Sequence, residues 1–133
     1  MYEPYATLTD YKAYVPEGQE LNPDVVKAAL RKASRHIDSL TYNRIVFRGF
    51  ENLTQFQQEI VKEVCCRLAI FETEYEDMIG GLLNGYSING VSVQMTAGVT
   101  VFAAYGIVMP KELYSLLIQT GLGWPVKHRI RFS

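Results

Sequence analysis

The stretch NPDVVKAALRKASRHIDSL, residues 22–40, predicts the fold most clearly. Asn22 is a favourable N-cap residue and Pro23 suits the first position of a helix. Apolar residues then recur at intervals of three and four, which is the period of a helix with one apolar face. They are Val26, Ala29, Leu30, Ala33, Ile37 and Leu40. We therefore expect an amphipathic helix that begins at Pro23 and ends between Leu40 and Asn43.

A second and longer helix is predicted from about Leu53 to Met78, with Asn52 as its cap. Its apolar residues again follow spacings of three and four: Leu53, Phe56, Ile60, Val64, Leu68, Phe71, Tyr75 and Met78. At 1.5 Å per residue this rod would be roughly 40 Å long. The glycines at 80–81 and the Asn-Gly pair at 84–85 are expected to stop it. Residues 44–50, between the two helices, are predicted to form a short extended piece.

The rest of the chain is predicted to form smaller elements around these two helices. A short helix near residues 7–14 would be capped by Thr7 or Thr9. Residues 86–95 alternate apolar and polar side chains, so the arm, about 86–103, reads as a β-hairpin or extended segment. Pro110 opens a short helix that Gly121 closes, with Leu113, Leu116 and Leu117 facing inward.

The predicted architecture is therefore mainly α: a small helical bundle of two long helices plus short helices, with the arm and a C-terminal tail, 122–133. The 133 residues suit one domain, with a core over about 7–121. A net charge of −1 and 20% charged residues give no sign of bulk nucleic-acid or membrane binding. The longest apolar stretch, 97–110, is too short to span a membrane.

The candidate reactive residues do not converge in the sequence pattern. His36 and Asp38 lie two positions apart, so on a helix they point about 200° away from each other. Asp38 is expected to point away from the apolar face and to pair with Arg35, Ser34 or Arg31 at the surface. This pattern favours a structural role.

Metal and thiol chemistry are also not favoured. Glu72 and Glu76 have the i, i+4 spacing of a carboxylate metal pair, but no histidine follows a di-metal pattern. Cys65 and Cys66 are adjacent and have no second pair for zinc or a disulfide, so they read as core residues in a reducing compartment. We predict no catalytic residue, no metal and no cofactor.

Two features instead point to a partner surface. The acids at 72–77 and the basic residues at 127–131 have opposite sign, so they could pair within one chain or between copies, although a solvated acidic face is the simpler reading. The arm and tail carry more apolar residues than a monomer needs, unless they fold back on their own core. The predicted interface residues are Tyr86, Ile88, Val91, Val93, Met95, Val99, Val101, Phe102, Trp124, Lys127, Arg129, Ile130, Arg131, Phe132, Glu72 and Glu76.

The order of these elements resembles the head–tail connector (adaptor, or head-completion) proteins of long-tailed bacteriophages and prophages, including the YqbG-like prophage proteins. The resemblance covers residues 5 to 124. It rests on LNPDVVKAALRKASRHIDSLTYNRI, FQQEIVKEVCCRLAIFETEYED, GYSINGVSVQM and VMPKELYSLLIQTGL.

The resemblance implies a structural role in the virion, with the host cytoplasm as the location before assembly. Such proteins form a ring, typically of about twelve copies, because a head-to-tail interface can close on itself. The implied partners are other copies of the chain, the portal protein and the next connector or tail-completion protein. The resemblance also implies nonspecific contact with DNA in the channel, and it implies no contact with a membrane.

Two other readings remain open at this point. One is a small helical protein–protein interaction module with a regulatory role, either monomeric or dimeric. The other is an enzyme built around His36, His128 or the acids at 72–77. We expect the connector role and no enzymatic activity.

Overall fold

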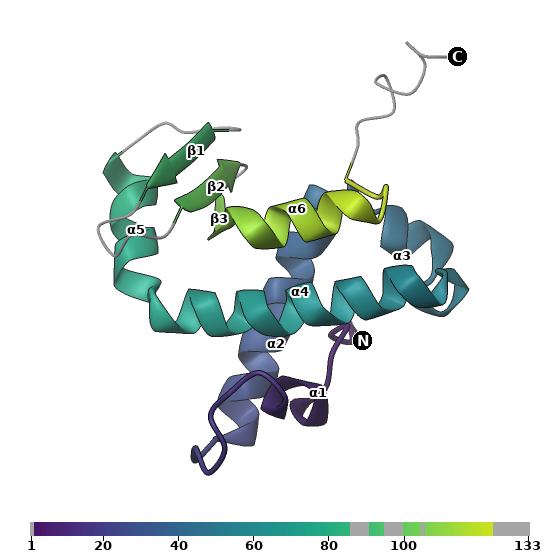
Figure 1. Ribbon diagram of the computed structural model, residues 1–133, viewed down its shortest axis with the longest axis horizontal. Coiled ribbons are helices and arrows are strands. Elements are labelled where there is room, and N and C mark those ends of the chain that lie inside the picture. The colour runs from purple at the N-terminus through teal and green to yellow at the C-terminus, as the bar shows by residue number, and fades with distance from the viewer. Residues whose placement is uncertain (1, 86–90, 95–99, 105, 124–133) are drawn as a thin grey trace.

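The computed structural model describes residues 2–85, 91–94, 100–104 and 106–123, and these are mainly helical. Helices form most of the chain and a small antiparallel sheet lies at one end (Figure 1), which confirms the predicted fold class. The elements in chain order are α1 (Leu8–Lys12), α2 (Pro23–Leu40), α3 (Arg44–Arg48), the 3₁₀ turn η1 (Phe50–Asn52), α4 (Gln55–Glu74), α5 (Glu76–Gly85), β1 (Val91–Gln94), β2 (Thr100–Ala104), β3 (Ile107–Pro110) and α6 (Lys111–Gln119).

Helix α2 begins and ends where the sequence predicted. The Asn22 side chain accepts a hydrogen bond from the Asp24 backbone N–H at 3.0 Å, and Pro23 occupies the first turn. Its apolar stripe is buried, with Ala33 and Ile37 fully excluded from solvent. The short helix α1 is also confirmed, because Thr7 and Asp10 form a reciprocal capping box at its start.

The second long helix is two helices, so the prediction of one uninterrupted rod is wrong. Helix α4 starts two residues later than expected, capped by Thr54 and Gln57 and not by Asn52. It ends at Glu74, and Tyr75 has the non-helical dihedrals φ −113° and ψ 28° before α5 begins. The glycines at 80–81 lie inside α5 and do not stop it, whereas α5 does end at Gly85, in the second predicted stop signal. The apolar period continues across Tyr75, so the pattern did not reveal the break.

Residues 44–50 are helical, and the prediction of an extended piece is wrong. Tyr42 and Asn43 both have positive φ, 56° and 59°, and turn the chain sharply after α2. The short helix α3 follows, and Gly49 closes it at φ 85°, a conformation that glycine adopts without strain. The positive-φ pair is a local backbone feature that the apolar pattern does not encode.

The arm is a β-hairpin with a third strand added. β1 pairs with β2 in register Ser92 with Phe102, and β2 pairs with β3 in register Phe102 with Met109, both antiparallel. The strand order is β1-β2-β3. Pro110 then caps α6, and Gly121 follows that helix at φ 77°, as the sequence predicted.

Helix α4 lies at the centre of the core. Helix α2 packs across it, and α6 and the edge of the sheet pack on it as well (Figure 1). The contact surface of α4 is fully buried at Val61, Val64 and Leu68, and Leu113 and Leu117 from α6 are equally excluded from water, whereas Leu116 is only half-buried. Cys65 and Cys66 are buried in this core with their sulfurs unpaired as disulfides, as the sequence predicted. Among the helices described, none has the length and apolar character that crossing a membrane requires.

Candidate functional site

Asp38, on α2, is buried and holds the N-terminal segment against the helix. The Tyr2 hydroxyl donates to Asp38 Oδ2 at 2.7 Å, and the Tyr5 hydroxyl donates to Asp38 Oδ1 at 2.5 Å. The side chain is only 4% exposed. Both carboxylate oxygens therefore have a donor, and the tyrosines come from more than thirty residues earlier in the chain.

The predicted surface pairing of Asp38 is wrong. Arg35 lies over the ring of Tyr2, 3.6 Å from the ring centroid, in place of an ion pair with Asp38. Ser34 is buried, where its hydroxyl donates to the Leu30 carbonyl and accepts from the Tyr5 N–H. The prediction failed because the N-terminal segment covers a face of α2 that lies outside the apolar stripe.

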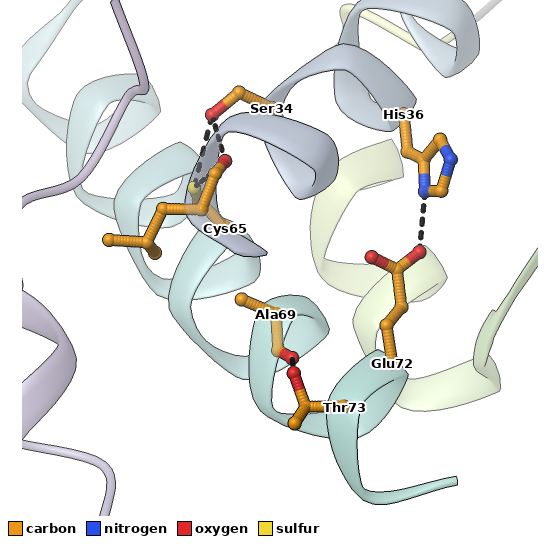
Figure 2. A network of polar contacts seen from close by, with 7 residues as sticks. Ser34, His36, Cys65, Ala69, Glu72 and Thr73 are labelled. Atoms are coloured by element: carbon orange, nitrogen blue, oxygen red, sulfur yellow. Dashed lines mark hydrogen bonds and ion pairs between the residues drawn. The ribbon is translucent and has the colours of Figure 1, made fainter. Parts of the chain in front are cut away.

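His36 lies on the other side of α2 and contacts α4. Its Nδ1 is 2.5 Å from Glu72 Oε2 (Figure 2), and His36 is partly exposed while Glu72 is 8% exposed. Glu72 Oε1 has no hydrogen-bond partner among the described residues. The structure therefore separates His36 from Asp38, as the helical spacing predicted, but it brings His36 to an acid that the sequence placed on a solvated face.

A cavity of about 270 Å³ opens beside this pair. Its walls come from α2, the α4–α5 junction, the turn at Gly106 and β3. The polar lining residues are Lys32, His36, Glu72 and Glu76, and the apolar lining includes Ile79 and Val108. Within the described part of the chain, no group of three or more histidines, cysteines, aspartates and glutamates is placed to hold a metal ion.

The two cysteines lie in a different environment, buried on α4, with Cys65 facing α2. The Ser34 hydroxyl is 3.3 Å from the sulfur of Cys65 (Figure 2). Burial raises the pKa of the Cys65 thiol to about 11 and that of Cys66 to about 12. Because the thiolate is the reactive form, both sulfurs are held in their unreactive state near neutral pH.

Exposed apolar residues lie on α3, just before it and in the first turn of α4, and Figure 1 shows these elements at the same end of the molecule. Phe47 is 87% exposed, and Val46, Phe56 and Tyr42 are also exposed. We call these four residues the α3 surface. Arg48 is exposed on the same short helix, and Arg44 donates to the Leu122 carbonyl at 2.8 Å, so the chain leaves the core after α6 beside this surface. The α3 surface was not predicted, because Val46 and Phe47 were assigned to an extended piece and Phe56 to the apolar face of the second helix, where it is in fact 53% exposed.

The predicted interface residues are only partly described. Val101 is fully buried in the core of this chain, and Phe102 stacks on Tyr114 with ring centroids 3.8 Å apart. Glu76 is exposed and lies at the start of α5, while Val91 and Val93 lie in β1. The other predicted residues lie outside the described residues: Tyr86, Ile88, Met95, Val99, Trp124, Lys127, Arg129, Ile130, Arg131 and Phe132.

Comparisons with known proteins found no match for this chain. No family model, no curated protein sequence and no solved structure is significantly similar to it.

Proposed function

We propose that this chain is a structural head–tail connector of a bacteriophage or prophage. In this role it forms a ring below the portal protein, extends the DNA channel and docks the next connector or tail layer. The observation that carries the proposal is the α3 surface, on which two phenylalanines and a valine are more than half exposed. Several large exposed apolar side chains at one end of a molecule favour a protein interface there, and the order of elements on which the connector resemblance rests supports the same role.

The charges at the two ends of the molecule favour a head-to-tail contact between copies. At the α3 end the exposed Arg48 and the partly exposed Arg44 outnumber the exposed Glu51, whereas Glu74, Glu76 and Asp77 are exposed where α4 passes into α5. Figure 1 shows these regions at opposite ends of α4. A contact between two different patches on each copy is heterologous, and such a contact generates a ring when its rotation closes. We propose that the α3 surface of one copy meets the acidic end of the next.

The test is electron microscopy of the purified chain mixed with the portal protein encoded in the same genome. We expect rings stacked on the portal with the wild-type chain. The double variant Val46→Ser and Phe47→Ser should lose the rings, because it removes apolar surface from the contact. The free energy of unfolding of this variant should differ from that of the wild type by less than about 0.5 kcal/mol, since both side chains are exposed.

Val25→Ser is the matched control. Val25 is 56% exposed, close to the 53% of Val46, but it lies in the first turn of α2 and not on α3. This variant should form rings like the wild type. If the wild-type chain neither binds the portal nor forms rings, the connector role is wrong, and the regulatory interaction module becomes the better reading. Genes for a portal and a capsid protein next to this one would separate the same two readings.

A further inference from the structure

The cavity beside Glu72 has the properties of a receptor for one side chain. Its volume of about 270 Å³ is below the range of roughly 300–1,000 Å³ in which small-molecule sites usually fall. Glu72 is more than nine-tenths buried, and its Oε1 has no donor among the described residues. A buried carboxylate oxygen without a donor is costly, so a donor that enters the cavity would be stabilised there.

We propose that this cavity binds an arginine side chain from the basic segment 127–131 of a second copy of the chain. This inference rests on the proposed function, in which copies meet head to tail. Glu72 and Glu76 are four residues apart in sequence, and both residues line the cavity. A guanidinium offers several donors in a planar fork, so it can serve two acceptors at once, which a lysine ammonium does less well.

The remaining walls suit the stem of an arginine. Ile79 and Val108 offer apolar surface to its methylene groups. Gly80 leaves space on the helix wall, because a Cβ placed there would meet no atom within 4 Å. Lys32 and His36 are the basic groups that line the cavity. Lys32 is exposed, so its ammonium can stay in water, and His36 already faces Glu72 Oε2.

The position of the tail favours a second copy over the same chain. Gln57 Nε2 donates to the Thr120 carbonyl at 2.9 Å, so the chain after α6 leaves near the start of α4. Glu72 lies fifteen residues further along α4, which corresponds to about 22 Å of helix. Six residue steps lead from Gly123 to Arg129 and eight to Arg131, which span at most about 21 and 28 Å when fully extended. An arginine of the same chain would therefore reach Glu72 only with a nearly fully extended tail. In the proposed head-to-tail contact, the α3 end of the neighbouring copy faces this cavity. The neighbour's chain leaves α6 at that same end, so its basic segment starts close to the cavity.

A binding experiment with a labelled peptide tests the proposal. The probe is the peptide LGWPVKHRIRFS, residues 122–133, with a fluorescent label, and its anisotropy reports binding. The receptor is the full chain with Arg129→Gln and Arg131→Gln, so that its own tail does not compete. In this background, Gly80→Leu fills the cavity without changing any charge, and Glu72→Gln removes the carboxylate without changing its size.

Gly81→Leu is the matched control for the steric variant. Gly81 is the next residue of α5, it does not line the cavity, and a Cβ there would also meet no atom within 4 Å. Leucine favours a helix more than glycine does, so neither substitution should disrupt α5. We expect Gly80→Leu to weaken peptide binding by at least about tenfold because the leucine occupies the space that the arginine needs. Glu72→Gln should weaken it by a similar factor because a charged hydrogen bond in a buried site is lost. Gly81→Leu should bind like the parent chain.

Two further measurements test whether the group in the cavity is an arginine and whether it comes from a second copy of the chain. A peptide in which lysine replaces both arginines should bind at least about threefold more weakly, because the fork is lost while the charge is kept. In sedimentation equilibrium, the self-association of the otherwise wild-type chain should depend on concentration, and Gly80→Leu should weaken it while Gly81→Leu should not.

The inference is wrong if the peptide does not bind, if Gly80→Leu and Gly81→Leu bind it equally, or if the lysine peptide binds as tightly as the arginine peptide. It is also wrong if Gly80→Leu leaves self-association unchanged. Portal-bound rings that form normally with the Gly80→Leu chain would reject this contact and leave the connector role intact. Peptide binding and self-association that both depend on Gly80, in a chain that forms no rings with the portal, would instead reject the connector role.

Discussion

The two buried carboxylates of this protein differ in how fully they are hydrogen-bonded. Asp38 on α2 and Glu72 on α4 are almost equally buried, at 4% and 8% exposure. Both oxygens of Asp38 accept a hydrogen bond from a tyrosine. Glu72 has one oxygen next to His36, and its other oxygen has no partner within the described residues.

The difference separates a structural site from an open one. A fully satisfied buried network stabilises one arrangement of the chain, whereas a partly satisfied one leaves a polar atom with a cost that a partner can remove. The Asp38 site is closed by the N-terminal segment, with Tyr5 also stacked on Phe50 at a centroid distance of 5.4 Å. The Glu72 site faces a cavity with room for one more side chain.

The largest expected effect comes from breaking the closed site. Asp38→Ala should lower the free energy of unfolding by about 3 kcal/mol, because two tyrosine hydroxyls lose their acceptor and the N-terminal segment loses its anchor. Urea denaturation followed by circular dichroism measures this change. Ser39→Ala, at the exposed neighbouring position, should change stability by less than about 0.5 kcal/mol. A loss below about 1 kcal/mol for Asp38→Ala would show that the closed site contributes little.

Alkaline pH should weaken the same site without any substitution. Burial, the hydrogen bond to Asp38 and its negative charge raise the pKa of Tyr2 and Tyr5 well above the ordinary value of about 10. The folded chain therefore holds these protons more tightly than the unfolded chain does. Their stabilising contribution is complete below about pH 10 and is lost as the pH rises through the folded-state pKa values. The buried thiols also lower the free energy of unfolding as the pH rises above about 8.5. Their pKa values are raised to about 11 and 12 in the folded chain, so the unfolded chain loses these protons first.

The urea midpoint, measured at each pH from 8 to 11, tests this expectation. It should fall steadily in the wild type. In Tyr5→Phe the fall above pH 10 should be shallower, because one hydroxyl that resists ionisation is gone, although the variant starts from a lower stability at pH 8. If the two chains show the same slope above pH 10, the Tyr5 hydroxyl does not carry this dependence. The slope between pH 8.5 and 10 should be the same in both chains, since it comes from the thiols.

Local features of the fold could be predicted from the sequence. The start of α2 depends on Asn22 and Pro23, which act within one helical turn. The apolar stripe of α2 depends only on apolar residues that recur every three or four positions within the same helix. The opening and closing of α6 depend in the same way on Pro110 and Gly121. The break at Tyr75 could not be predicted, because a single non-helical residue leaves the spacing of apolar side chains almost unchanged.

The buried carboxylates could not be predicted because distant segments bury them. A helical pattern tells which face is apolar, but not which polar face a remote segment will cover. Tyr2 and Tyr5 belonged to a visible tyrosine-rich start, and this excess of aromatic residues was the available signal for the cover over Asp38. Glu72 was considered as part of an acidic run, as half of a carboxylate pair with Glu76 and as an interface residue. Nothing local indicates that His36, thirty-six residues earlier, would pack against it.

The smallest expected effect on stability comes from the open site. Glu72→Gln should change the free energy of unfolding by less than about 1 kcal/mol, because the amide can still donate to or accept from His36 Nδ1, whichever tautomer is present. One end of the side chain lacks a partner both before and after the substitution, and the variant has no charge to desolvate. Urea denaturation under the conditions used for Asp38→Ala gives a direct comparison, with the exposed Glu76→Gln as the control. A loss above about 2 kcal/mol would mean that Glu72 is as firmly bonded as Asp38, and the distinction between a closed and an open carboxylate would then fail.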